Sequence, residues 1–182
     1  MKRDEAINIL VKLTLKVLSK DARENKLTDW WGIDQEHPEF DKLPEALQSE
    51  ILQFDEPQKD AMDEDYDSLI CVGLRSKYLG VTNEYLSKQI SEQLDSNETV
   101  VGFQEELFAC PCCEFKTLSV KGEYDICPVC FWEDDGATDP AFYSSPNHMT
   151  LTQAQKNFSK FGAMSESFLP LLDRDRLEMY SK

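Results

Sequence analysis

Cys110-Pro111-Cys112-Cys113 and Cys127-Pro128-Val129-Cys130 are the two stretches that decide the fold of this chain. Each reads C-P-x-C, and thirteen residues separate them. Two thiolates three positions apart on a tight turn face one point about 2.3 Å from each sulfur, which is the zinc–sulfur distance. The proline fixes φ and helps to form the turn before a metal arrives. The spacing therefore predicts one structural Zn²⁺ with four ligands: Cys110, Cys113, Cys127 and Cys130.

Two further residues are alternative ligands for this ion. Cys112 lies inside the first stretch and has no counterpart in the second, where Val129 stands. It is interpreted either as a small apolar filler beside the metal or as a redox or sensor thiol. His148 could replace one cysteine, but the asparagine before it and the helix cap after it favour a hydrogen bond that orders a turn.

The segment between the two cysteine stretches predicts a β-hairpin. Residues 115–120 alternate roughly between apolar and polar, Lys121-Gly122 is a turn signal, and residues 123–126 return the chain to Cys127. Such a hairpin would carry one cysteine pair at each end, as in a zinc ribbon. One ion would then fasten a sheet that is too small to be stable alone.

Further motifs follow the second cysteine pair. They are the stretch YDICPVCFWEDDG at 124–136, NHMTL at 147–151, AQKNF at 154–158 and FGA at 161–163. Together with Cys110-Pro111-Cys112-Cys113, they resemble the cysteine-rich CPCC domain family of bacterial proteins over about residues 106–164. Glu114 departs from the family, which often has glycine there. The resemblance implies zinc binding and no established enzymatic activity.

The first hundred residues predict a helical domain. Apolar side chains recur at helical spacing, as in the stripe that begins at Ala6. Pro44 suits the first position of a helix, and Thr82 suits the cap of another. The predicted helical segments are residues 6–18, 44–52, 69–78 and 82–94.

These patterns predict an α+β fold: an N-terminal α-helical domain, then a small zinc-ribbon-like β-hairpin domain with a covering helix. The covering helix would begin at the capping box Thr150-x-x-Gln153 and stop at Gly162. A strand at 99–103 would lead into the zinc region. The expected limits are 1–97 for the helical domain, 98–164 for the CPCC zinc-ribbon-like domain, and 165–182 for a C-terminal tail or helix that packs back.

Trp30 and Trp31 are adjacent in the helical half. Neighbouring side chains on a helix point about 100° apart, so both rings cannot lie in one core layer. We expect one tryptophan in the core and the other over a seam between domains. The alternative is an exposed aromatic anchor for a partner protein.

Charge and composition restrict the partners. The 182-residue chain has a formal net charge of −16 and a sequence pI near 4.4. Affinity for nucleic acid depends on Lys and Arg that displace counterions, so no nucleic-acid partner is expected. Lys12 and Lys16 interrupt the first apolar stretch, which argues against a signal peptide, and no membrane partner is expected. A cytoplasmic location is expected, and because the cytoplasm keeps thiols reduced, the six cysteines of the chain favour metal binding over disulfides.

The residues give little support to catalysis. The chain has two histidines, His37 and His148, so a histidine-rich catalytic zinc site cannot form, and four sulfur ligands leave no open coordination position. Residues 133–135 (EDD) could hold a second ion or act in acid–base chemistry, but a hydrated turn closed by Gly136 is the favoured interpretation.

We therefore expect a zinc-binding, non-catalytic protein-interaction module with an unknown protein partner. One alternative is an acidic immunity-type inhibitor of a basic toxin or nuclease, because a high negative charge favours electrostatic capture of a basic target. The other alternative is a thiol redox or metal sensor protein that uses Cys112.

Overall fold

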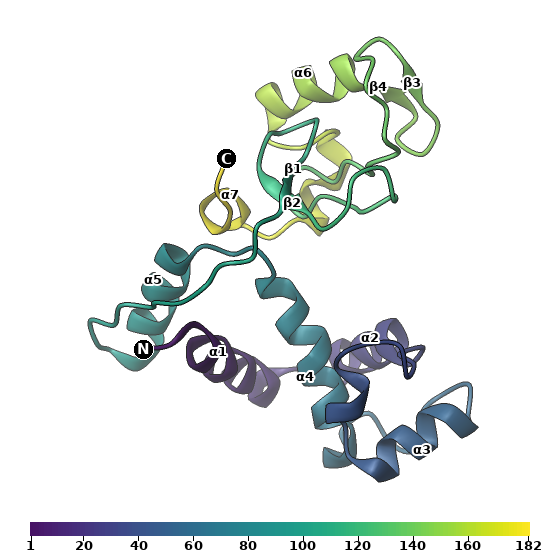
Figure 1. The fold of residues 1–182 in the computed structure, drawn as a ribbon, viewed down its shortest axis with the longest axis vertical. Coiled ribbons are helices and arrows are strands. Elements are labelled where there is room, and N and C mark those ends of the chain that lie inside the picture. Colours follow the sequence, from purple (N-terminus) through teal and green to yellow (C-terminus); the bar gives the residue numbers. More distant parts are fainter. The chain divides into compact units, whose positions relative to one another are not determined.

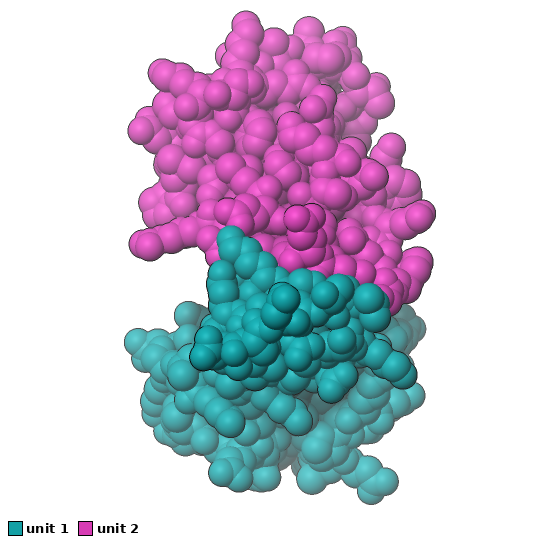
Figure 2. All heavy atoms as spheres, turned by 90° about the vertical axis from the view of Figure 1, so that its left-hand side faces the viewer, with its two compact units in different colours: residues 1–79, 86–101 teal, residues 80–85, 102–182 magenta.

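The computed structural model describes residues 1–182, which divide into two compact units (Figure 2). The first unit contains residues 1–79 and 86–101, and the second contains residues 80–85 and 102–182. The first is helical, and the second combines two small antiparallel hairpins with helices, so the predicted α+β class is confirmed. None of the helices combines the length and the apolar character that a membrane crossing requires.

Helix α4 is the central element of the first unit, because α1 and α2 both pack against it (Figure 1). Its Leu69 and Ile70 are fully buried. The α-helices are α1 Arg3–Val17, α2 Lys20–Trp30, α3 Glu45–Gln53, α4 Asp67–Arg75 and α5 Asn83–Leu94, of which residues from Leu86 onward belong to this unit. Three 3-10 helices join them: η1 Phe40–Lys42, η2 Glu64–Tyr66 and η3 Ser76–Tyr78.

The four predicted helical segments are all helical. Pro44 is the N-cap of α3 rather than its first residue, and the Thr82 hydroxyl accepts a hydrogen bond from the Tyr85 amide at 3.2 Å, as expected of a cap. Helix α2 was not among the helices predicted from the sequence. It buries only Arg23 and Leu27, so it lacks the apolar stripe by which a helix is recognised in a sequence.

Trp31 is the tryptophan that lies in the core. It is 6 % exposed, its indole N–H donates to the Phe54 carbonyl at 2.9 Å, and its ring meets Tyr66 edge to face. Trp30 is half-buried and meets His37 edge to face, at 5.7 Å between ring centroids. Trp30 thus has its aromatic contact inside the first unit.

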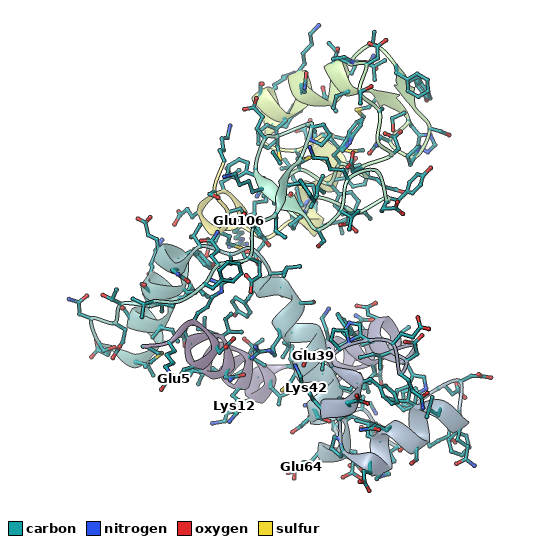
Figure 3. The ribbon with its side chains drawn as sticks, in the orientation of Figure 1. Glu5, Lys12, Glu39, Lys42, Glu64 and Glu106 are labelled. Carbon is teal, nitrogen blue, oxygen red and sulfur yellow. The ribbon has the colours of Figure 1, made fainter.

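Polar contacts fix the loops of this unit. The buried guanidinium of Arg23 donates to the Ala61 carbonyl at 2.6 Å and pairs with Asp67 at 2.5 Å, which ties α2 to the acidic segment 60–67. Near η1, the Lys42 ammonium lies 2.6 Å from a Glu39 carboxylate oxygen (Figure 3). The Arg23 side chain is buried and makes several bonds, so it constrains the fold more than the exposed pair of Lys42 does.

The second unit contains two short antiparallel hairpins. Strand β1 pairs with β2, and β3 pairs with β4. The predicted pairing of residues 115–120 with 123–126 is wrong, because β2 pairs with the chain before the first cysteine pair, and Ile126 instead forms a bridge with Glu133. The strands are β1 Phe108–Ala109, β2 Lys116–Leu118, β3 Tyr143–Ser144 and β4 Met149–Thr150.

Helix α6, Leu151–Phe161, follows β4 directly. Its predicted capping box is present, since the Thr150 side chain accepts from the Gln153 amide while the Gln153 side chain accepts from the Thr150 amide. Gly162 ends the helix in the left-handed region, with φ 79°, where glycine is favoured. The start, the stop and the type of this element are therefore confirmed.

The C-terminal residues belong to the second unit. They form η4 Glu166–Leu171 and α7 Arg176–Met179. The Arg176 guanidinium donates to the carbonyls of Val129 at 3.0 Å and Gly162 at 3.1 Å. The Lys116 amide donates to the Ser181 carbonyl at 2.8 Å. The C-terminus thus fastens the second cysteine turn, the end of α6 and strand β2.

Gly73 of α4 tests the packing of the first unit. A Cβ there would lie 2.7 Å from Trp30 Cδ1, so Gly73→Ala must displace a packed indole. We expect this clash to outweigh the helix propensity of alanine and to lower the free energy of unfolding by about 1–2 kcal/mol in urea titrations. Gly32→Ala is the matched control, because nothing lies within 4 Å of its Cβ. Equal stabilities of the two variants would contradict this packing.

Candidate metal centre

Four cysteine sulfur atoms meet in the second unit. Those of Cys110 and Cys130 lie 3.6 Å apart, as do those of Cys113 and Cys127, and all four lie within 4.8 Å of one another. Each of these cysteines is at most 1 % exposed. A tetrahedral ion with bonds of about 2.3 Å would separate its sulfur ligands by about 3.8 Å. The structure therefore brings together the four residues that the spacing predicted, in an arrangement that fits one tetrahedral metal.

The first cysteine pair lies on a tight turn closed by backbone hydrogen bonds. The Glu114 amide donates to the Cys110 carbonyl at 2.8 Å, and the Cys110 amide donates to the Phe115 carbonyl at 2.9 Å. The second bond continues the ladder of β1 and β2. Both sulfur atoms of this pair are therefore presented by one rigid loop at the end of a hairpin.

The second cysteine pair repeats this arrangement. The Phe131 amide donates to the Cys127 carbonyl at 2.9 Å, and the Cys127 amide donates to the Trp132 carbonyl at 2.8 Å. Residues four and five positions after the first cysteine play the same parts in both turns. The sequence repeat C-P-x-C is therefore also a structural repeat, and its two copies supply two ligands each.

Both turns need a left-handed residue directly after the second cysteine. Glu114 has φ 68° and Phe131 has φ 69°, a region that glycine enters without the steric cost paid by other residues. This explains why a glycine suits the position of Glu114. Phe131 has a compensating contact, since its ring stacks on Phe168 with centroids 4.3 Å apart.

Apolar side chains exclude water from the sulfur atoms. Trp132, Val129 and Leu118 are completely buried, as is Ala154 of α6. Trp132, directly after the second cysteine turn, has no exposed surface, whereas Phe131 is only half-buried. A dry cluster of this kind favours neutral thiols until a metal replaces their protons.

The pKa values of the thiols reflect this environment. Hydrogen bonds with Cys110 and Cys112, together with burial, raise the pKa of Cys130. Burial also tends to raise the pKa of Cys127, but hydrogen bonds from Cys110, Cys113 and the Thr117 hydroxyl lower it overall. The Thr117 oxygen lies 3.1 Å from the Cys127 sulfur. The hydrogen bond from the Thr117 hydroxyl therefore favours the thiolate form of Cys127.

The two alternative ligands lie outside the converging group. Cys112 is 4 % exposed and is not among the four clustered cysteines. His148 is exposed in the turn between β3 and β4, where its amide donates to the Ser145 carbonyl at 3.3 Å. The structure therefore assembles four cysteines and leaves His148 on the surface.

Asn147 supports the site in a way that the sequence alone did not reveal. It is 3 % exposed, and its amide side chain donates to the Glu133 carbonyl at 2.7 Å and accepts from the Glu133 amide at 2.9 Å. It also donates to the Ser144 hydroxyl at 2.7 Å. Asn147 thereby joins the β3–β4 hairpin to the chain that leaves the second cysteine turn.

Asp134 is a second support of the site. The residue is 4 % exposed, and its carboxylate accepts from the Gly122 amide at 2.9 Å. Its backbone bonds to Tyr124 and Asp125. The expected hydrated turn is therefore wrong at this position, because the buried carboxylate needs hydrogen-bond donors and finds one, the Gly122 amide, in the loop between the cysteine pairs.

Comparison with protein families matches residues 108–176 to the family described as Cysteine-rich CPCC. The resemblance expected at about 106–164 is thus confirmed, and the match continues through η4 to the start of α7. No curated protein and no solved structure gave a match to the chain.

The left-handed residue of the first turn can be tested by Glu114→Gly. We expect this substitution to raise the free energy of unfolding of the second unit by about 1 kcal/mol, because it removes the steric cost of φ 68°. The Lys182–Glu114 pair that it removes is exposed and contributes little. Denaturant unfolding at fixed metal content provides the measurement, with Glu106→Gly as the control in the preceding exposed loop. A destabilised Glu114→Gly variant would refute this explanation.

Proposed function

We propose that the cysteine-rich CPCC domain at residues 108–176 binds one Zn²⁺ through Cys110, Cys113, Cys127 and Cys130. The observation that carries this proposal is the convergence of four buried sulfur atoms within 4.8 Å. Thiolate ligands favour zinc over hard cations such as Mg²⁺ and Ca²⁺, and a set of four thiolates in this geometry is typical of structural zinc.

The role proposed for the ion is structural. The four strands of the second unit have only two or three residues each, which is too few for an independently stable sheet. An ion shared by two turns adds folding free energy that such strands cannot supply, on the order of 10 kcal/mol for structural zinc. Four sulfur ligands also fill the coordination sphere, so no position remains for a substrate or a water.

The biological role that we propose is a non-catalytic protein-interaction module in the cytoplasm. The closed metal site supports it, since such a site shapes a surface and performs no reaction. Six free cysteines suit a reducing compartment. The formal charge of −16 favours a basic protein as partner, as the immunity-type alternative also requires. The sensor alternative has less support because Cys112 is 4 % exposed, and a reactive thiol needs access.

Substitution of single cysteines tests the ligand set. Cys113→Ser and Cys127→Ser should each reduce bound zinc from one ion per chain to nearly none, because each removes one of four ligands. Elemental analysis of the purified full chain is the measurement. Cys112→Ser and Cys71→Ser are matched controls that should keep the full complement. Retention of zinc by Cys113→Ser together with its loss from Cys112→Ser would overturn the assignment.

Metal removal tests the structural role. After chelation, the amides of residues 108–134 should exchange hydrogen at least about tenfold faster, because the turns lose their common ion. Amides of α1 and α4 should keep their protection, since the first unit has its own apolar core. Hydrogen exchange read by mass spectrometry resolves both regions in one sample. Unchanged protection at 108–134 in demonstrably metal-free protein would refute a structural ion.

A further inference from the structure

The Thr117 hydroxyl meets one sulfur atom of the cysteine cluster. Its oxygen lies 3.1 Å from the sulfur of Cys127, a completely buried residue. Thr117 belongs to β2, which follows the first cysteine turn, whereas Cys127 begins the second turn. The contact therefore joins the two turns at a sulfur atom itself, unlike the bonds of Asn147 and Asp134, which fix the surrounding backbone.

An irregularity in strand β2 explains the direction of this side chain. Neighbouring residues of β1 pair with Leu118 and Lys116, so Thr117 between them is the extra residue in the ladder. A regular strand would place Lys116 and Leu118 on the same face, but Lys116 is exposed and Leu118 is completely buried. An extra residue of this kind bends a strand and redirects its side chains. This bulge accounts for a Thr117 side chain that reaches Cys127.

The backbone around this bulge is held by hydrogen bonds. The Phe115 carbonyl accepts from the Cys110 amide at 2.9 Å, and the Lys116 amide donates to the Ser181 carbonyl at 2.8 Å. Thr117 itself is half-buried. Because the backbone is already fixed, little conformational entropy remains to be lost when the hydroxyl is ordered against a sulfur ligand.

The direction of the hydrogen bond follows from metal binding. A cysteine that binds a metal has lost its proton, so its sulfur can only accept, and the Thr117 hydroxyl has to be the donor. The Phe115 carbonyl, 3.4 Å from the same hydroxyl oxygen, is the competing acceptor. A hydrogen bond to a charged acceptor is roughly twice as strong as one between neutral groups. The thiolate of Cys127 is therefore the favoured acceptor.

We propose that Thr117 is a positioning residue of the zinc site, whose hydroxyl holds the Cys127 sulfur in its ligand position and tightens the binding of zinc. Four thiolates carry more negative charge than one Zn²⁺ neutralises, and the hydroxyl hydrogen offsets part of the excess without occupying a coordination position. Partners that bond to a ligand rather than to the metal typically change metal affinity by about 10–100-fold. This inference rests on the proposed zinc-binding function.

Two substitutions at this position separate the hydroxyl from the shape of the side chain. Thr117→Val removes the donor but keeps a branched shape that suits a strand, whereas Thr117→Ser keeps the donor. In the full chain, competition with a chelator of known affinity should show that Thr117→Val binds zinc about 10–100-fold more weakly. Thr117→Ser should remain within about threefold of the native chain, because it retains the hydroxyl.

Thr152→Val is the matched control in the second unit. Thr152 is also half-buried, but its hydroxyl donates to the Pro140 carbonyl at 2.9 Å and not to sulfur. If loss of any hydroxyl hydrogen bond in this unit weakened zinc binding, both valine variants would show it. We expect Thr152→Val to keep the affinity of the native chain.

Cobalt provides a readout that a merely structural role would not change. Co²⁺ can replace zinc among four thiolates, and its charge-transfer absorption reports the electron density on the sulfur atoms. Removal of a hydrogen bond raises that density, so the absorption of Thr117→Val at saturating Co²⁺ should move to longer wavelength. The absorption of Thr117→Ser and Thr152→Val should stay at the native position.

Three results would overturn the inference: native zinc affinity in Thr117→Val, a loss of affinity in Thr117→Ser or Thr152→Val equal to that in Thr117→Val, or an unshifted cobalt spectrum in Thr117→Val. The proposed zinc site would survive each of them, because its own test is the zinc content of the native chain. A native chain that binds no zinc would instead refute the proposed function itself.

Discussion

Burial of four cysteine sulfur atoms in one place is the constraint on which the second unit depends. Its β-structure consists of two hairpins with strands of two or three residues, and such hairpins are at best marginally stable in water. The first cysteine turn lies between strands β1 and β2, and the second must stay close to it. Trp132, Val129 and Leu118 are completely buried around these turns. Charged thiolates that are buried away from water need a cation. If the thiols were neutral and bound no metal, little would hold the two cysteine turns together.

The repeated turn gives a simple account of how this site forms. Each C-P-x-C segment closes on itself through backbone hydrogen bonds and a left-handed residue, Glu114 or Phe131. Each turn therefore presents two sulfur atoms through local structure alone. The long-range task is to join the two turns, and Asn147, Asp134 and Arg176 contribute by bonding to the chain around them.

The local features were the part that could be predicted from the sequence. Cysteine spacing identified the four residues that cluster, and the cap signals at Thr82, Thr150 and Gly162 were correct because a cap depends on neighbours a few positions away. The partner of strand β2 was predicted wrongly, since alternation marks a strand but does not select its partner. Asn147 and Asp134 were missed as supports because their role comes from burial, which the short polar stretches around them conceal.

Helix α2 illustrates a second reason for incomplete prediction. Helix α2 is held by the buried guanidinium of Arg23 and by few apolar side chains, so its sequence has no clear stripe.

X-ray absorption at the zinc edge tests the central claim most directly. The account predicts that protein isolated without added metal contains zinc with four sulfur neighbours at about 2.3 Å and no nitrogen or oxygen ligand. A first shell that includes nitrogen or oxygen, or a sample that contains no zinc, would contradict it.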